Sequence, residues 1–564
     1  ITGRDHHHNI HEQFIDIESP HLSNWLQYYC ALTLDEIASL TGIESNLLLP
    51  VLNELLENQV IIKGQLLRED EKEYWCDAEN YESMLRILRH TSRVEIRPIP
   101  ISGLTPFIFA WQKTQPGHQL DDITNALDCL RGLPTKASLW ETELLPARVS
   151  RYTTQLLDLV FQEDNMLWLG TGQQQALFTF KEDLDLFAHS NEPSTELLTK
   201  QQSKQTISGG SKIQSGLAAE LFNDPKGRYD FGSLLDQSTL AAAELADIIW
   251  QQVWQGKLSN DSLKSLRRGI ETKFKIPDMS QTESQCRMRR SRRGGFNQWR
   301  SAAPFSGNWF QISYPQEPLD LIQREELNKD RVRILMDRYG IVFREQLKQE
   351  LPAFQWRAVF KSLRLMELTG EIIGGYFFSG IDGLQFMTAA SLRLLQQIQS
   401  SSLPTQTTTP LKAHSTQQQA AADTPNPIPN VFWINACDPA SSCGLGLASL
   451  RGKLPRRIES NHLVYDDQKL VLISERYGKA LTINVAENDS NLRYYYQVLR
   501  HLLYRSFAPL SKISIQTING ISAKQSPYLA SLTDSFEVVF DHRTLYLQRS
   551  LDEDSYASDF TQPS

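Results

Sequence analysis

Positive side chains gather in one interval of an otherwise acidic chain. Between Lys264 and Arg300 there are eleven Lys or Arg residues against three acids, although the whole 564-residue chain has a net charge of -9. The cations singled out as nucleic-acid-binding candidates are Lys264, Arg267, Arg268, Arg287, Arg289, Arg290, Arg292 and Arg293. The planar guanidinium fork matches phosphate oxygens, and each neutralised phosphate releases counterions. The interval therefore predicts salt-sensitive contact with nucleic acid; the alternative is a solvated loop that contacts none.

Two further kinds of side chain could act on nucleic acid. Trp299 and Trp309 could stack on unpaired bases, although single tryptophans more often belong to a core or an interface. Three aspartates near the end could serve base excision, since a carboxylate can activate water or stabilise a developing sugar cation after a base is flipped out. They are Asp552, Asp554 and Asp559. Nothing nearby orients them, so an acidic tail is the alternative and the catalytic residue stays unknown.

Several kinds of chemistry have no motif in the sequence. The three Gly-Lys pairs are followed by Leu, Leu and Ala, so there is no phosphate-binding loop of a nucleotide motor. A nucleophile elbow and a zinc-protease helix are also missing. The histidines at 6, 7, 8 and 11 lie in a polar terminal segment without acidic or cysteine support. We therefore expect neither a metal site nor a cofactor in this chain.

Length and composition indicate several domains outside a membrane. At roughly 150 residues per domain, the chain should hold about three to five compact units. Apolar residues make up 40% of the chain, and no run of about 18 of them could span a bilayer. Six scattered cysteines, at 30, 76, 129, 286, 437 and 443, favour free thiols in a reducing cytoplasm. The start at Ile1, without a signal-peptide pattern, favours a fragment of a longer polypeptide.

One pattern recurs along the chain: a leucine-rich helix, a polar break, two apolar residues and a glycine. Its glycines are Gly64, Gly375 and, in a looser copy, Gly170. In the first copy, Thr33 is expected to cap a short helix and Gly42 to supply a left-handed turn before a second helix. Helix, turn, helix and strand is the order of a helix-turn-helix with a wing, whose second helix can lie in a DNA groove. Such repeats predict an array of small modules.

The chain is therefore predicted to be an α+β multidomain protein, with tandem winged-helix modules followed by a β-rich, barrel-like C-terminal domain. The last domain is expected from alternating strands after a Gln/Thr/Pro-rich linker. The predicted ranges are winged helix 1 at 23–68, a helical connector at 69–120, winged-helix-like 2 at 121–188, a Ser/Gln-rich linker at 189–232, winged-helix-like 3 at 233–277, an Arg-rich loop at 278–300, winged helix 4 at 301–395, a linker at 396–430, the β-rich domain at 431–549 and an acidic tail at 550–564.

The order of motifs resembles the C-terminal region of Lhr, the large helicase-related proteins of bacteria, a superfamily 2 helicase group. The motifs include Trp140-Glu141, Leu145-Pro146-Ala147-Arg148, Phe109-Ala110-Trp111-Gln112, Leu130-Arg131-Gly132, Arg338-Tyr339-Gly340 and Asp438-Pro439-Ala440. Two departures stand at Leu88, where family members usually have His, and at Ser441-Ser442-Cys443, where they have Asn-Pro-Tyr.

By this resemblance, a preceding part of the protein would be an ATP-dependent, 3'-to-5' helicase in DNA repair, and ATP and Mg would belong to that motor. This region would then be a cytoplasmic DNA-binding and assembly module, with single-stranded or forked DNA as partner, a homo-oligomer such as a tetramer, and no contact with a membrane. The family's C-terminal region is also associated with uracil-DNA glycosylase activity, and its arrangement is similar to winged-helix DNA glycosylases. A glycosylase for uracil or damaged bases and a pure oligomerisation scaffold therefore remain the alternatives.

Overall fold

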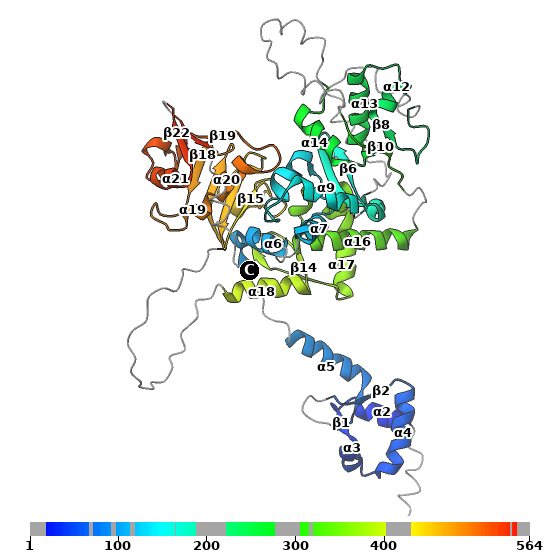
Figure 1. Ribbon diagram of the computed structural model, residues 1–564. Helices are drawn as coiled ribbons and strands as arrows, with labels where there is room; N and C mark the ends of the chain where they lie inside the picture. Colours follow the sequence, from blue (N-terminus) through cyan, green and yellow to red (C-terminus); the bar gives the residue numbers. More distant parts are fainter. Residues whose placement is uncertain are drawn as a thin grey trace, which may run out of the picture. The chain divides into compact units, whose positions relative to one another are not determined.

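The repeated sequence pattern folds into four copies of one small unit. The computed structural model describes residues 19–66, 72–91, 97–112, 119–163, 165–187, 221–276, 305–314, 320–401, 430–541 and 544–549 (Figure 1). Each copy has a short strand, a helix-turn-helix segment and two wing strands, and the last strand lies between the other two. The four sheets have the orders β1-β3-β2, β5-β7-β6, β8-β10-β9 and β11-β14-β12. The predicted array of winged-helix modules is thus confirmed.

The first module belongs to a unit of its own, residues 1–97. Thr33 and Glu36 form a reciprocal capping box at the start of α3, and Gly42 ends that helix with a φ of 70°. The elements are α2 (Ser19–Leu26), β1 (Leu32–Thr33), α3 (Leu34–Thr41), α4 (Ser45–Glu57), β2 (Ile61–Gly64), β3 (Tyr74–Asp77) and α5 (Ala78–Thr91). The predicted connector at 69–120 therefore differs from the structure, because its buried Tyr74–Asp77 segment supplies the central strand of this sheet.

The second and third modules share one hydrophobic core within the unit 98–564. The second module consists of α6 (Leu104–Gln112), α7 (Gln119–Cys129), β5 (Thr135–Lys136), α8 (Ala137–Leu139), a π-helical turn (Trp140–Leu144), α9 (Thr154–Glu163), β6 (Met166–Gly172) and β7 (Gln175–Phe180). The third consists of β8 (Tyr229–Asp230), α12 (Phe231–Gln237), α13 (Ala242–Trp254), β9 (Leu258–Asn260), α14 (Leu263–Thr272) and β10 (Asn308–Gln311).

The arginine-rich interval is an insertion in the wing of the third module. Its described part, α14, follows wing strand β9, and the partner strand β10 comes only after the interval. The predicted start of winged helix 4 at residue 301 therefore differs from the structure, since β10 pairs with β8 and β9. Likewise, β8 and the start of α12 belong to the third module and not to the predicted linker.

The fourth module has a long first helix and an extended wing. Its elements are α16 (Leu321–Tyr339), β11 (Ile341–Val342), α17 (Trp356–Leu368), β12 (Ile372–Gly375), β13 (Phe378–Ser379), β14 (Gln385–Thr388) and α18 (Ala389–Ser401). Strand β13 leaves the wing and pairs in parallel with β4 (Ile99–Pro100), which precedes α6. This pairing joins the fourth module to the second.

The C-terminal domain contains two open sheets, so the predicted barrel-like form is not supported. The larger sheet has the order β15-β16-β17-β18-β20-β21, and its end strands do not pair with each other in the described residues. Its strands are β15 (Val431–Asn435), β16 (His462–Asp466), β17 (Lys469–Glu475), β18 (Ala480–Ile483), β20 (Thr517–Ile518) and β21 (Ile521–Ser522). The remaining elements are α19 (Leu492–Tyr495), α20 (Gln497–Tyr504), β19 (Lys512–Ile515), α21 (Leu529–Ser535), β22 (Glu537–Phe540) and β23 (Leu545–Gln548). The strands predicted in this domain are otherwise confirmed.

A fully buried ion pair joins the second module to the C-terminal domain. Arg148 donates from Nη1 to Asp438 Oδ2 and from Nη2 to Asp438 Oδ1, both at 2.8 Å, and both side chains are 0% exposed. Arg148 also donates to the Leu144 carbonyl and to Gln112, and Asp438 accepts from the Ala440 amide, whereas Arg148 Nε is buried without a hydrogen-bond partner among the described residues. Two motifs that are 290 residues apart in sequence therefore meet here.

We predict that Gly170→Ala destabilises the protein, whereas Gly64→Ala at the matching position of the first module does not. A Cβ at Gly170 would lie 2.1 Å from the Val253 carbonyl oxygen of α13, while one at Gly64 would come no closer than 3.9 Å to any other side chain. Overpacking of this kind costs about 1–3 kcal/mol. Calorimetric melting should show a lower Tm for Gly170→Ala only; equal melting of both variants would refute the close approach.

We also predict that Asp438→Asn lowers the free energy of unfolding by about 3–5 kcal/mol, because it leaves the Arg148 guanidinium buried without a counter-charge. The matched control is Glu459→Gln. It removes an exposed pair between the same two domains, Lys136 to Glu459 at 3.1 Å, and should cost less than about 1 kcal/mol. Urea unfolding followed by tryptophan fluorescence measures both. Similar midpoints for the two variants would show that the buried pair contributes little.

Candidate functional site

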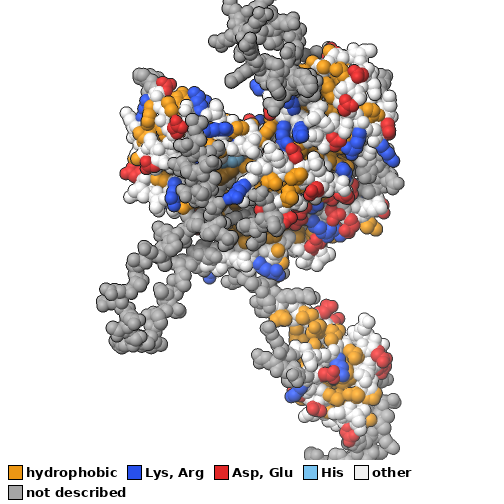
Figure 2. All heavy atoms as spheres, in the orientation of Figure 1, with side chains coloured by type: hydrophobic (Ala, Val, Ile, Leu, Met, Phe, Trp, Pro, Cys, Tyr) orange, Lys and Arg blue, Asp and Glu red, His pale blue; other side chains and the backbone are white. Residues whose placement is uncertain are grey.

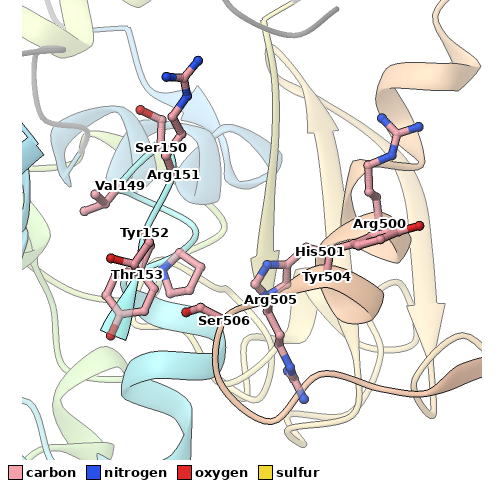
Figure 3. A pocket seen from close by; sticks show the side chains of 11 residues that line it. Val149, Ser150, Arg151, Tyr152, Thr153, Arg500, His501, Tyr504, Arg505 and Ser506 are labelled. Carbon is pink, nitrogen blue, oxygen red and sulfur yellow. The ribbon is translucent and has the colours of Figure 1, made fainter. Parts of the chain in front are cut away.

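A cavity of about 450 Å³ lies between the second module and the C-terminal domain (Figure 3). One wall is the segment from Pro146 to Thr153, which links the π-helical turn to α9. The other wall is the end of α20 with the two residues that follow it, including His501 and Arg505. Three arginines line the cavity and no carboxylate does. The two walls come from segments about 350 residues apart in sequence, so the spacing of residues within sequence motifs could not predict this cavity.

A buried carboxylate lies behind the α20 wall. Glu143 accepts a hydrogen bond from Arg505 Nη1 at 2.6 Å, and its other oxygen lies 3.0 Å from His462 Nε2. Burial by itself raises the pKa of Glu143, but His462, His501 and Arg505 together outweigh burial and hold that pKa below its usual value. Glu143 is therefore an ionised group that fixes Arg505 from behind.

His501 is held as a neutral ring at the cavity wall. Its Nε2 donates to the Thr142 carbonyl at 2.7 Å, and its ring stacks on Trp433 with centroids 4.2 Å apart. Burial lowers the pKa of His501 to about 4; the positive charge of Arg505 acts in the same direction, while the Glu143 carboxylate and the hydrogen bond to Thr142 act against it. At neutral pH the cavity therefore gains its positive charge from the arginines alone.

The predicted phosphate contact Arg267 is instead engaged inside the protein. Its guanidinium donates to Glu141 at 2.7 Å, to Asp158 at 2.9 Å and to the Thr154 carbonyl at 3.1 Å, and its side chain is only 12% exposed. Glu141 also accepts from the Tyr152 hydroxyl at 2.7 Å. Arg267 thus attaches α14 to α9. Its N–H groups donate to two carboxylates and a carbonyl inside the protein and are not available to a phosphate.

The other sequence candidates differ in exposure, and several lie outside the described residues. Lys264 is exposed on α14, and Arg268, on the same helix, pairs with Glu271 at 3.3 Å. Trp309 is a core residue, as expected for most single tryptophans, because it is 0% exposed and packs against Trp250 in the shared core, so it cannot stack on a base. Outside the described residues lie His6, His7, His8, His11, Arg287, Arg289, Arg290, Arg292, Arg293, Trp299, Asp552, Asp554 and Asp559.

A second surface, missed in the sequence, lies on the helix that precedes the wing of the fourth module. Arg357, Lys361 and Arg364 occupy one exposed face of α17, while Val359, Leu363 and Met366 face the core. Lys361 contacts Glu325 at 3.2 Å, and Arg364 pairs with Glu367. Spacings of three and four residues place these cations side by side on a helix. This spacing is visible in the sequence, but the arginine cluster at 287–293 is denser and dominates the local charge balance.

Exposed apolar side chains accompany the cations of α17. Phe360 on that helix is 39% exposed, and Tyr376, directly after wing strand β12, is 65% exposed. Figure 2 shows Lys and Arg side chains distributed over the large unit together with orange apolar patches. A cationic helix face next to an exposed aromatic wing residue has the composition of a nucleic-acid surface.

The described residues contain neither a membrane-spanning helix nor a cluster of metal ligands. No helix there is both long and apolar enough to cross a membrane. In the same ranges, no three His, Cys, Asp or Glu side chains are grouped closely enough to hold a metal ion.

Comparison with known proteins identifies two of the modules. Residues 100–184 and residues 322–407 each match a family described as large helicase-related protein, winged-helix domain. These ranges correspond to the second and fourth modules, whose strand orders are β5-β7-β6 and β11-β14-β12.

Relatives match a larger part of the chain. A protein of Escherichia coli K12 named Lhr helicase/uracil glycosylase is 25% identical over 462 residues, which cover 78% of this chain and 27% of the relative. A Mycolicibacterium smegmatis protein named Lhr helicase/probable uracil glycosylase is 22% identical over 506 residues, 87% of this chain and 30% of the relative. The chain thus spans less than a third of the length of these curated relatives.

Among solved structures, the DNA glycosylase AlkZ of Streptomyces sahachiroi covers 72% of this chain and 97% of its own, with 10% identity and a TM-score of 0.40. The family matches and the relatives agree with the order of motifs along the sequence. The chain therefore resembles the large helicase-related (Lhr) proteins, and residues 100–184 and 322–407 match winged-helix domains of that family.

Proposed function

We propose that this chain is the DNA-binding and assembly region of a longer Lhr-like DNA-repair helicase, whose ATP-driven motor lies outside it. The two winged-helix matches and the names of the relatives support this proposal. Single-stranded or forked DNA is the proposed partner, because a translocating helicase generates both. A homo-oligomer such as a tetramer is the proposed assembly.

One observation carries the proposal: α17 alone among the four helices that precede a wing has cationic residues. The other three, α4, α9 and α13, are fully described and contain no Lys or Arg. Binding of a helix in a groove requires positive charge to replace the counterions of the phosphates. The fourth module is therefore the one suited to enter a groove.

The arginine-rich insertion supplies a second cationic element. Along the chain it lies between the wing strands β9 and β10 of the third module. Five arginines within seven residues would bind phosphates without regard to sequence. We propose that this segment strengthens binding, whereas α17 sets the position on the strand.

We predict that the variant Arg357→Gln, Lys361→Gln, Arg364→Gln binds a forked oligonucleotide at least about tenfold more weakly than the parent chain. The slope of log K against log salt should fall by about 2 to 3, since each lost phosphate contact removes roughly 0.9 from the slope on a duplex. Fluorescence anisotropy between 50 and 300 mM salt measures both quantities.

The matched control for the α17 variant changes three exposed cations of the C-terminal domain, Arg451, Lys453 and Arg456, to Gln. It has the same net charge as the α17 variant and should bind like the parent. Equal weakening in both triple variants would indicate a general charge effect and remove α17 from the proposal. Light scattering on the same samples separates binding from assembly: a defined oligomer without DNA affinity would support the scaffold alternative instead.

Uracil excision is a second candidate function, favoured by the names of both relatives. We predict that the purified chain, incubated with a uracil-containing strand and then with alkali, yields strand breaks at the uracil position. The same strand with thymine is the control. Intact uracil strands after long incubation with excess protein would reject excision, and DNA binding would remain as the function.

A further inference from the structure

The cationic face of α17 continues into an apolar end. Arg357, Lys361 and Arg364 follow one another at spacings of four and three residues, and Leu368, four residues further along, lies on the same face of the helix. Leu368 is the last residue of α17 and is 79% exposed. The phosphates of a duplex would give this leucine no apolar partner, so the end of the helix differs in chemistry from the part that carries the cations.

Two residues of the wing extend this apolar end. Ile373 in strand β12 and Tyr376, directly after that strand, are both exposed. Leu368, Ile373 and Tyr376 thus follow one another across the turn from α17 into the wing. Single apolar residues on a surface are ordinary, whereas a group of them beside polar neighbours marks a binding surface.

Contacts within the module place Tyr376 close to the cations. Arg364 pairs with one carboxylate oxygen of Glu367, and the other oxygen of Glu367 lies so close to Gly374 that a side chain there would collide with it. Tyr376 follows Gly374 by two residues, which is at most about 7 Å along an extended chain. Arg364 and the backbone of Tyr376 are therefore separated only by Glu367 and Gly374.

The backbone that carries Tyr376 is fixed on both sides. Before it, Gly375 pairs with Gln385 of strand β14. After it, the amides of Phe377 and Phe378 donate to Gln385 Oε1 at 3.0 and 2.9 Å, and Gln385 Nε2 donates to the Phe378 carbonyl at 2.9 Å. Both phenylalanine rings are buried. An exposed ring on a backbone held in this way loses little conformational freedom when it binds a partner.

An exposed aromatic ring beside phosphate-binding cations suits unpaired DNA better than a continuous duplex. Within a duplex the faces of the bases are covered by their stacked neighbours, and proteins reach only the edges of the bases in the grooves. An unpaired base exposes its face, and such faces stack on aromatic side chains whatever the base. At a fork, the phosphates of the paired arm and the first free base faces lie next to each other.

We propose that Tyr376 stacks on an unpaired base next to the duplex arm that α17 holds, so that the fourth module binds a fork in preference to a continuous duplex. Leu368 and Ile373 add apolar surface beside the same ring. This inference rests on the proposed DNA binding by α17, and it names the residue that selects the form of the DNA.

The test compares a forked duplex with a continuous duplex of the same paired sequence, both bound by the full chain. Tyr376→Ala removes the ring, and Tyr376→Phe keeps it. The control is Tyr28→Ala, which removes an exposed tyrosine ring of the first module. Fluorescence anisotropy gives the affinity of each variant for both kinds of DNA, and thermal melting verifies that each variant is folded.

We expect Tyr376→Ala to lower the ratio of fork affinity to duplex affinity at least about fivefold, because loss of a side chain that stacks on a base has an effect of this size. Tyr376→Phe and Tyr28→Ala should keep the ratio of the parent chain. An unchanged ratio in folded Tyr376→Ala, or an equal loss on fork and duplex, would overturn the stacking role.

Forks with an abasic residue at one of the first three unpaired positions identify the base that is stacked. At one position the parent chain should lose the same factor as Tyr376→Ala loses on the complete fork, and Tyr376→Ala should lose nothing further there, since the two changes remove one shared contact. An effect of Tyr376→Ala that persists on every abasic fork would show that the ring contacts none of these bases and would reject the proposal.

Failure of this inference and failure of the proposed function give different results. If the α17 triple variant loses DNA affinity while Tyr376→Ala keeps the fork preference, Tyr376 is not a stacking residue and DNA binding by α17 stands. A parent chain that binds fork and duplex equally well would also reject the role of Tyr376 alone. A parent chain that binds neither DNA would reject DNA binding itself, and the role of Tyr376 with it.

Discussion

The desolvation of Arg148 is the constraint on which the large unit depends. A guanidinium with no exposed surface has to be paired with an opposite charge; Asp438 supplies that charge, while Gln112 and the Leu144 carbonyl accept from the terminal nitrogens. The partners come from α6, from the π-helical turn and from the C-terminal domain. Displacement of one of these elements would leave a buried charge uncompensated. Helix α6, the π-helical turn and the C-terminal domain therefore have to pack together.

The same constraint extends to the fourth module through Gln112. This side chain accepts from Arg148 with its oxygen and donates with its nitrogen to the Arg338 carbonyl. Arg338 is itself buried and paired with Glu350 at 2.6 Å. Two buried ion pairs are thus joined by one amide. Because loss of one partner would leave a buried charge unpaired, the residues of these motifs depend on one another, which explains why their order along the chain was informative.

The sequence allowed prediction of those structural features that depend on residues close together in the chain. Thr33 with Glu36 and the left-handed Gly42 define the first module within ten residues, and alternating side chains define the strands of the last domain. The position of the arginine-rich interval in a wing could not be predicted, because strand β10 pairs with β9 across an insertion. Arg267 shows the same limit: its charge was visible, but its partners Glu141 and Asp158 lie more than 100 residues away.

The four modules share a fold but differ in the packing of the helix that precedes each wing. In the third module that helix, α13, is part of the core shared with the second, and α9 of the second is bonded to α14 through Asp158 and Arg267. These contacts occupy part of the surface of both helices. In the first module α4 has exposed leucines, Leu47 and Leu49, where a groove-binding helix would have cations. Among the four helices that precede a wing, only α17 combines an exposed face with positive charge. A shared topology is therefore evidence about ancestry and packing, whereas function has to be argued from each surface separately.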